Sequence, residues 1–220
     1  MLVMGDNEIS RSHVKSVAKA MLLLETLAYI VEYRRIESSE HINRTKQITG
    51  TLIVQMQNDR RYQSELETLD IPILIQASAL HDIGKIGIPD RILLKPGKLA
   101  ADEFKTIETH TTLGSDIFES LAFDFANDVY FDYCLTISRY HHERWNGKGY
   151  PDGLKQEEIP LIARIVALVD VYDALVSERV YKKAFTHDQA VGIIKSESGS
   201  HFDPGIVEAF IACESKIKQI

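Results

Sequence analysis

The sequence predicts an all-α fold, with one helical domain and an N-terminal extension helix. Apolar residues recur at spacings of three and four through most of the 220 residues, the period of an amphipathic helix. No stretch alternates cleanly between apolar and polar residues as a half-buried strand would. Proline residues also separate the periodic segments. We therefore expect helices over residues 9–35, 38–58, 65–82, 101–121, 128–142, 161–177, 187–196 and 204–217.

The first of these helices is amphipathic and contains no proline. Charged residues fall between apolar positions that are three or four apart, namely Val17, Met21, Leu24, Leu27, Ala28 and Val31. Such a helix could pack on the main body, pair with a second copy in a homodimer, or transmit a signal from another module. We divide the chain into residues 1–30, a helix or linker, and residues 31–220, the main domain.

The later elements follow from apolar runs and capping residues. The run from Ile71 to Leu80 predicts the buried end of the third helix, and the apolar residues around Asp170 predict a buried sixth helix. Thr186 stands before the segment that begins at His187, where its hydroxyl can cap a helix N-terminus. No internal repeat, low-complexity stretch or Gly/Ser-rich linker divides the body.

Composition narrows the class of protein. The chain is 45% hydrophobic and 26% charged, which is typical of a globular domain. A net charge of −7 argues against DNA or an anionic membrane as partner. Cys134 and Cys213 lie far apart, and we see neither a signal peptide nor an apolar run long enough to span a membrane. These features predict a cytoplasmic location.

The dipeptide His81-Asp82 is the first candidate for metal chemistry. Imidazole and carboxylate groups are costly to bury without partners, and they are good ligands for divalent cations. Such a dipeptide is more often a satisfied core pair, but Lys85 follows three residues later, so a cation lies one helical turn from the carboxylate. The carboxylate could bridge two metal ions while the lysine holds a phosphate oxygen.

Adjacent histidines provide a second candidate. His141 and His142 would point about 100° apart on a helix, so packing seldom requires both. They precede a loop from Gly147 to Pro151, at which the backbone could turn both rings toward one ion. His110 is weaker evidence by itself, because a histidine on a helix is more often a hydrogen-bonded surface or core residue.

The remaining candidates are ambiguous when taken singly. Asp170 could bind metal, or it could pair with an arginine such as Arg164 or Arg179. Glu37 and His41 are four residues apart, on one helix face, and could be two ligands or an ordinary surface pair. A cationic cluster with one aromatic ring consists of Arg179, Tyr181 and Lys182. It could hold a phosphate or a base, although such clusters are usually solvated.

Taken together, these segments resemble the HD-GYP phosphodiesterases, a subgroup of the HD superfamily of metal-dependent phosphohydrolases. The resemblance covers roughly residues 30 to 212 and rests on the segments HDIGKIGIPDRILLKPGKL, HHERWNGKGYPDGL and ARIVALVDVYDALVSERVYKK. It implies an all-helical domain that hydrolyses cyclic di-GMP to pGpG and on to GMP, through hydroxide activated by two or three divalent metal ions, iron or manganese.

The resemblance also assigns residues to the site. It implies that one metal is surrounded by His41, His81, Asp82 and Asp170. It implies that Asp82 and Lys85 are catalytic residues. It implies that Asp82 bridges to a second metal, which is held by His110, His141 and His142. Glu37 matches the ligand of a third metal. Contacts to phosphate or guanine are implied for Lys85, Tyr150, Arg179, Tyr181 and Lys182.

Three alternatives remain open from the sequence. The chain could hydrolyse another nucleotide, such as a mixed cyclic GMP–AMP. It could be a catalytically silent receptor of cyclic dinucleotides. It could act mainly as an interaction module that docks a diguanylate cyclase through the loop at residues 147–151. We recognise no receiver or sensor domain in the chain, so we expect regulation by a missing or separate module.

Overall fold

A computed structural model describes residues 6–34, 40–121, 128–178 and 183–220 of the chain. The secondary structure of these residues is helical, which confirms the predicted all-α class. The α-helices are α1 (Asp6–Arg34), α2 (Glu40–Met56), α3 (Arg60–Leu66), α4 (Ile71–Ala77), α5 (Asp90–Leu93), α6 (Ala101–Glu108), α7 (His110–Leu121), α8 (Val129–Tyr140), α9 (Leu161–Val176), α10 (His187–Ser196) and α11 (Pro204–Ile217). The 3₁₀ turns are η1 (Ser78–Leu80), η2 (Ile83–Gly87) and η3 (Gln156–Glu158).

The prediction of one helix over residues 65–82 is wrong. The chain turns after α3, and α4 starts afresh because the side chain of Asp70 accepts a hydrogen bond from the Ile73 amide at 3.2 Å. Pro72 lies in the first turn of α4, where a missing N–H costs no hydrogen bond. The segment then tightens into η1, so His81 and Asp82 lie in a turn rather than on a regular helix.

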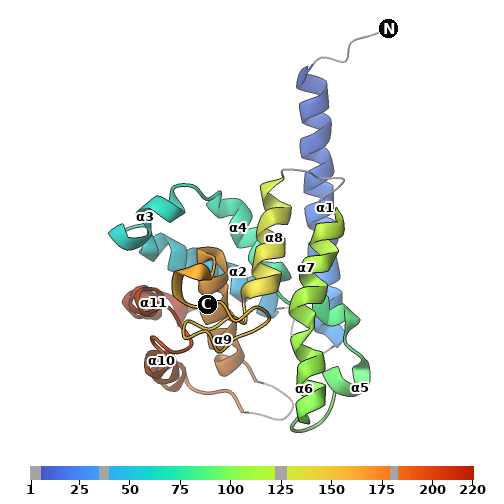
Figure 1. Cartoon of the computed structure of the whole chain (residues 1–220). Coiled ribbons are helices and arrows are strands. Elements are labelled where there is room, and N and C mark those ends of the chain that lie inside the picture. The colour runs from blue at the N-terminus through green and yellow to red at the C-terminus, as the bar shows by residue number, and fades with distance from the viewer. Residues whose placement is uncertain (1–5, 35–39, 122–127, 179–182) are drawn as a thin grey trace.

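The core is built around α9 and α2. Residues 161–169 of α9 are all buried, as expected for a helix that is apolar on every side. Helix α9 contacts α2, α8, α10 and α11, and α2 also contacts α4 and η1 (Figure 1). Burial on all sides holds α9 rigidly, and this helix carries Asp170 in its middle.

Helix α1 packs on the body through one face and rises beyond it at the N-terminal end (Figure 1). Leu24, Ala28 and Val31 are buried, and the helix contacts η1 and η2, which confirms the predicted amphipathic character. Its outer face exposes a set of large apolar side chains, Leu22, Leu23, Leu27, Ile30 and Tyr33. Pairing with a second copy or with another module through this face stays a prediction.

Polar contacts fix the C-terminal end of α1 to the turn that follows Asp82. The guanidinium of Arg34 donates to the carbonyl oxygens of Lys85 at 3.4 Å, Ile86 at 3.2 Å and Ile88 at 3.3 Å. It also pairs with Asp90 at 2.5 Å. Nearer the N-terminus of α1, Glu25 forms an ion pair with Lys46 of α2. The last turn of α1 is therefore joined to η2.

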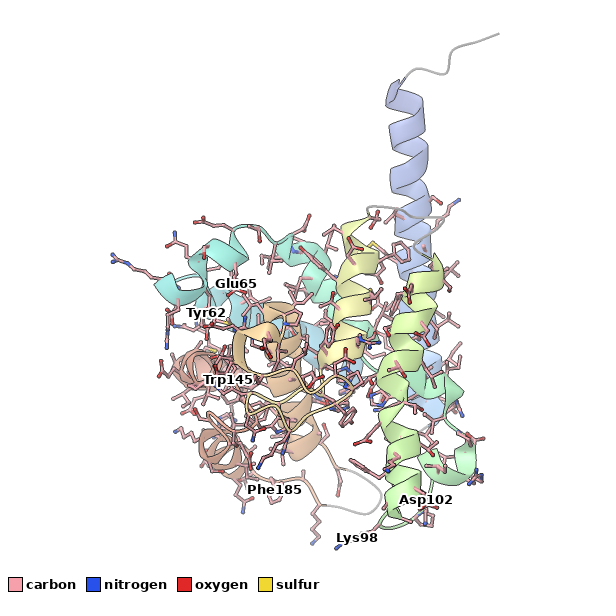
Figure 2. The ribbon with its side chains drawn as sticks, viewed as in Figure 1. Tyr62, Glu65, Lys98, Asp102, Trp145 and Phe185 are labelled. Carbon is pink, nitrogen blue, oxygen red and sulfur yellow. The ribbon has the colours of Figure 1, made fainter. Side chains whose placement is uncertain are left out.

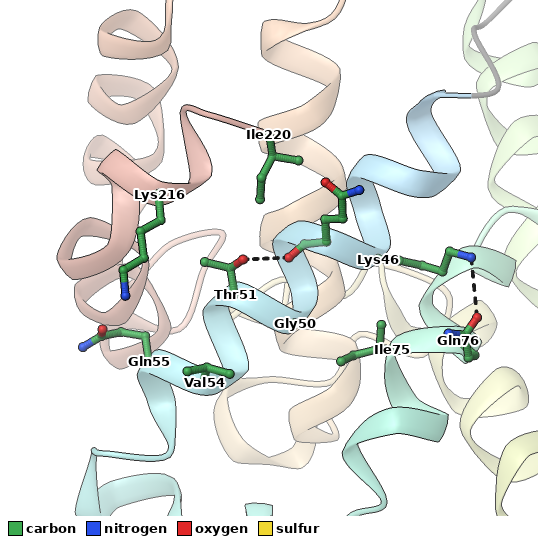
Figure 3. A pocket seen from close by; sticks show the side chains of 10 residues that line it. Lys46, Gly50, Thr51, Val54, Gln55, Ile75, Gln76, Lys216 and Ile220 are labelled. Atoms are coloured by element: carbon green, nitrogen blue, oxygen red, sulfur yellow. Dashed lines mark hydrogen bonds between the residues drawn. The ribbon is translucent and has the colours of Figure 1, made fainter.

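An open groove lies between α2, α4 and the end of α11, and residues of the His/Asp cluster described below do not line it (Figure 3). Gly50, Val54 and Ile75 form its floor, with Ile220 at the end of the chain above them. At one end of the groove Lys46 donates a hydrogen bond to Gln76 at 3.5 Å. In the part of the chain that the structure describes, none of the helices combines the length and apolarity needed to cross a membrane.

Candidate metal centre

Close backbone packing brings the His81-Asp82 turn against α7. A Cβ atom placed on Gly84 would lie 1.9 Å from the His110 carbonyl oxygen and 2.4 Å from the Gly114 amide nitrogen. Only glycine fits at that separation. Gly114 in turn faces Ser138 of α8, where a Cβ would lie 3.1 Å from the serine Cβ. These small residues let η2, α7 and α8 approach, and so they bring three histidine-bearing segments together.

Three histidines present the same ring nitrogen to the space between those segments. The Nδ1 of His81 donates to the Ser78 carbonyl at 3.0 Å, and the Nδ1 of His110 donates to the Ile107 carbonyl at 2.6 Å. His141 likewise donates from Nδ1 to the carbonyl of Ile137 at 3.0 Å. A neutral imidazole with a proton on Nδ1 keeps its lone pair on Nε2. The backbone therefore sets the tautomer that a metal ligand needs.

Asp82 lies at the centre of these rings. Its Oδ1 is 3.3 Å from the Nε2 of His110 and 3.7 Å from the Nε2 of His141. Its Oδ2 is 3.4 Å from the Nε2 of His81 and forms an ion pair with the ammonium of Lys85. One carboxylate oxygen thus faces each group of histidines. This is the arrangement in which a carboxylate can bridge two cations.

His41 and Asp170 complete the side of the cluster around His81. The Oδ1 of Asp170 lies 3.6 Å from the Nε2 of His81, and the rings of His41 and His81 pack edge to face with centroids 5.5 Å apart. His41 donates from Nδ1 to Asp173 at 2.6 Å, which leaves its Nε2 as the lone-pair nitrogen. Of the two arginines considered above as partners of Asp170, Arg164 instead bonds Asp203 at 2.7 Å, and Arg179 lies outside the described residues.

The donor atoms fit divalent metal ions. His41, His81 and Asp82 each offer an atom within 4.8 Å of the others, and so do the members of a second group, Asp82, His110, His141 and His142. The Nε2 of His81 is buried without a hydrogen-bond partner among the described residues. The Nε2 atoms of His110 and His141 are 3.4 Å apart. Since backbone carbonyls hold the protons on their Nδ1 atoms, two lone pairs face each other there, and a cation would satisfy both.

The charges of the cluster also suit a cation. Burial disfavours ionisation of Asp82, but Lys85 and His81 outweigh it and hold the pKa of Asp82 well below its usual range. Burial also opposes the charge of Asp170, yet its contact with His81 keeps the pKa of that carboxyl well below normal. Burial, together with repulsion from neighbouring imidazoles, lowers the pKa of His142 well below its ordinary value. Ionised carboxylates and neutral imidazole are the forms that bind metal.

His81 differs from His142 in the direction in which its pKa is shifted. Burial would lower its pKa, but the charges of Asp82 and Asp170 outweigh burial and raise the pKa well above the ordinary value. A metal ion that occupied this position would have to displace a proton. Metal affinity should therefore fall as the pH falls.

The loop after His142 folds back tightly onto the cluster. A Cβ on Gly149 would lie 2.5 Å from the Cα of Glu143, so only glycine can occupy this position of the loop. The buried carboxylate of Glu143 accepts hydrogen bonds from the amides of Asp152 at 2.7 Å and Gly153 at 2.9 Å. The Tyr150 ring then packs on His142, with centroids 4.9 Å apart.

A second set of contacts anchors this loop on the side of α3. The guanidinium of Arg164 lies 5.9 Å from the centroid of the Trp145 ring and bonds Glu65 at 3.2 Å and Asp203 at 2.7 Å. Tyr62 donates its hydroxyl proton to Asp203 at 2.8 Å. Tyr62, Glu65 and Trp145 gather on one flank of the molecule (Figure 2). The loop is therefore held at both ends.

The structure brings most of the predicted ligands together, at the cluster formed by His41, His81, Asp82, His110, His141, His142 and Asp170. Lys85 contacts the same cluster through Asp82, and Tyr150 contacts it through His142. Four predicted residues lie outside the described part of the chain, namely Glu37, Arg179, Tyr181 and Lys182.

A family model described as an HD domain matches residues 25–206, which is most of the chain and includes every residue of the cluster. The chain belongs to the HD domain family. The matched residues include His81-Asp82, the turn at the centre of the site.

The chain is similar to proteins that are named as cyclic-dinucleotide phosphodiesterases. The chain is 40% identical over 213 residues to a cyclic di-GMP phosphodiesterase of Vibrio cholerae serotype O1, covering 97% of this chain and 43% of the relative. It is 34% identical over 189 residues to 3'3'-cGAMP-specific phosphodiesterase 2 of the same organism, covering 86% of this chain and 34% of that protein. The chain thus spans less than half the length of these relatives.

The fold has also been seen in a solved structure. Bd1817, an HDG"Y"P protein from Bdellovibrio bacteriovorus, superimposes with a TM-score of 0.53 at 15% sequence identity, covering 81% of this chain and 51% of that one. At this identity the likeness concerns the fold of the HD domain alone.

Sequence reasoning missed the residues that orient the ligands. Asp173 holds His41, and it also bonds Arg44 at 2.5 Å. Glu32 of α1 is buried too, and it lies beside a narrow gap that His41 and His81 also line. A signal for Asp173 existed, because it follows Asp170 by three residues on the same apolar helix. Nothing in the local sequence marked Glu32, which becomes a neighbour only when α1 packs.

Proposed function

We propose that this HD domain hydrolyses cyclic di-GMP to pGpG, and on to GMP, at a centre of two or three divalent metal ions. The observation that carries the proposal is the position of Asp82, with one carboxylate oxygen facing His81 and the other facing His110 and His141. The similarity to proteins named cyclic di-GMP phosphodiesterases supports the choice of substrate.

The ligands divide between two positions that share Asp82. One position would be held by His41, His81, Asp82 and Asp170, and the second by Asp82, His110, His141 and His142. When bound, the ions would supply a water of lowered pKa and positive charge beside the phosphate. Nitrogen and oxygen donors suit iron or manganese. A third ion depends on Glu37, which lies outside the described residues and stays a prediction.

The chain itself contributes charge and shape. Lys85 is buried with its ammonium on Asp82, so its positive charge lies where an anionic phosphate would arrive. Burial raises the pKa of the Tyr150 phenol, which keeps this group a neutral hydrogen-bond donor beside the cluster. Arg179, Tyr181 and Lys182 are the further phosphate or base contacts that we predict.

Replacement of Asp82 tests the proposal directly. In Asp82→Asn we expect less than 1% of wild-type turnover and loss of bound metal by elemental analysis, with unchanged helicity by circular dichroism. The matched control is Asp132→Asn, an exposed acid on α8, which should keep both metal and activity. Products should be separated chromatographically after anaerobic purification. Turnover within twofold of wild type in a folded Asp82→Asn protein would refute the shared-carboxylate role.

The substrate and the type of function need a separate panel. Wild-type protein should hydrolyse cyclic di-GMP faster than 3'3'-cGAMP, and preference for the mixed dinucleotide would correct the substrate. Tight binding of either nucleotide without turnover in metal-replete protein would identify a silent receptor instead. Docking of a diguanylate cyclase through residues 147–151 would appear as pull-down of that cyclase by wild-type protein and its loss in a loop variant.

A further inference from the structure

Phe104 is a large apolar side chain that the fold leaves in contact with solvent. It lies on α6, a helix that has no buried residue among its eight, and its exposed fraction is 49%. The outer end of this helix, marked by Asp102, projects from the body (Figure 2). The helix does not need Phe104 to form, because Glu103 caps its start by accepting from the Ala100 amide at 2.7 Å and pairs with Lys95 at 2.5 Å.

Aromatic rings lead from the metal cluster outward to this residue. The ring of His142, one of the candidate ligands, packs on Tyr150 at 4.9 Å with an interplanar angle of 34°. Tyr150 in turn meets the ring of Phe104 edge to face, with centroids 6.5 Å apart at 83°. Exposure rises along this path, since His142 and Tyr150 are part-buried and Phe104 is half exposed.

The position suits a base of a bound dinucleotide. A diester held at the cluster carries its bases one sugar away from the phosphorus, and Phe104 is one aromatic ring beyond Tyr150, which itself contacts two ligand histidines. Because Phe104 meets Tyr150 through an edge-to-face contact and is half exposed, part of its ring can accept a stacked base. Stacking on a phenyl face tolerates any purine, because every base has a π surface.

We propose that Phe104 stacks on one purine base of the cyclic dinucleotide and thereby determines how tightly this substrate class is bound. The inference rests on the proposed function and adds a residue that the motifs did not indicate. A purely structural alternative would be that Phe104 packs on Tyr150 only to hold the loop. The two differ in what they require, because packing needs apolar volume and stacking needs an aromatic face.

The test compares Phe104→Leu, Phe104→Tyr and Phe104→Trp with the wild type. Leucine keeps apolar volume but removes the π face, so we expect KM for cyclic di-GMP to rise about 5- to 150-fold, the range for loss of one base–aromatic stack, with kcat within twofold. Tyrosine and tryptophan should restore KM. The control Leu94→Ala removes an apolar side chain of similar exposure, 42%, and should leave KM unchanged.

A binding signal that does not depend on turnover comes from fluorescence. The chain has one tryptophan, Trp145, so Phe104→Trp adds an indole at the proposed base site. Rapid mixing of metal-replete Phe104→Trp protein with cyclic di-GMP should quench the added emission before products form, whereas wild-type emission should change little.

The outcomes separate the inference from the proposed function. If the wild type turns over cyclic di-GMP and Phe104→Leu has an unchanged KM, or loses kcat instead, the stacking role is overturned and the proposed function stands. The absence of quenching in Phe104→Trp would also overturn it. If metal-replete wild type hydrolyses neither cyclic di-GMP nor 3'3'-cGAMP, both proposals fail.

Discussion

Substitution of Gly84 by alanine should dismantle the metal centre while the rest of the fold persists. The new Cβ would start 1.9 Å from the His110 carbonyl oxygen, and real Cβ contacts are essentially never shorter than 3.0 Å. The turn that carries Asp82 must therefore move away from α7 by about 1.1 Å, the difference between those two distances. Metal sites tolerate ligand displacements of only about 0.2 Å.

The displacement acts on the pair that the centre depends on. Asp82 Oδ1 and His110 Nε2 are now 3.3 Å apart, and the clash pushes their two backbones in opposite directions. We expect bound metal and turnover to fall at least tenfold. Overpacking against backbone should also destabilise the protein by about 1–3 kcal/mol, which lowers Tm by several degrees for a domain of this size.

The matched control is Gly192→Ala on α10. A Cβ at Gly192 meets nothing within 4 Å, so alanine there should raise stability by about 0.5–1 kcal/mol through helix propensity and leave metal binding unchanged. Elemental analysis, calorimetric titration with Mn²⁺ and thermal unfolding would be measured on both variants. A Gly84→Ala protein with wild-type metal content and turnover would show that the close approach of η2 and α7 does not position the ligands.

Two further predictions concern residues around the centre. Asp173→Asn should weaken metal binding at the His41 position about 10- to 100-fold in a Mn²⁺ titration, because Asp173 orients that ring. Glu40→Gln, which removes an exposed ion-pair partner of Arg44, should not weaken it, and equal affinities in the two variants would contradict the orienting role. Burial lowers the pKa of His201 to about 4, so the unfolded state binds the proton more tightly. Stability from this residue is complete above the unfolded pKa near 6.5 and should fall by up to ~3 kcal/mol as the pH drops from 6.5 to 4. Chemical denaturation of wild type and His201→Asn should show this as a steeper acid loss in the wild type, and parallel pH profiles would refute it.

Local chemistry explains which predictions the sequence could support. Helices α9, α10 and α11 lie within a residue of their expected bounds, because long apolar periodicity and capping residues act within a few positions of the chain. The prediction over residues 65–82 failed because Asp70 and Pro72 start a new helix, a local signal that the apolar run obscured. The candidate ligand histidines could be identified because few types of side chain bind divalent metals and because the motifs that contain these histidines are long.

Residue identity by itself determined the helical class, the donor atoms available to a metal and the glycines that allow close backbone contact. Only the tertiary structure decided that Asp82 faces histidines on both sides, that Asp173 orients His41, and that Phe104 lies beside Tyr150. The physical reason is distance along the chain. Asp173 lies 132 residues from His41, and contacts between segments so far apart depend on how whole helices pack, which no local pattern encodes.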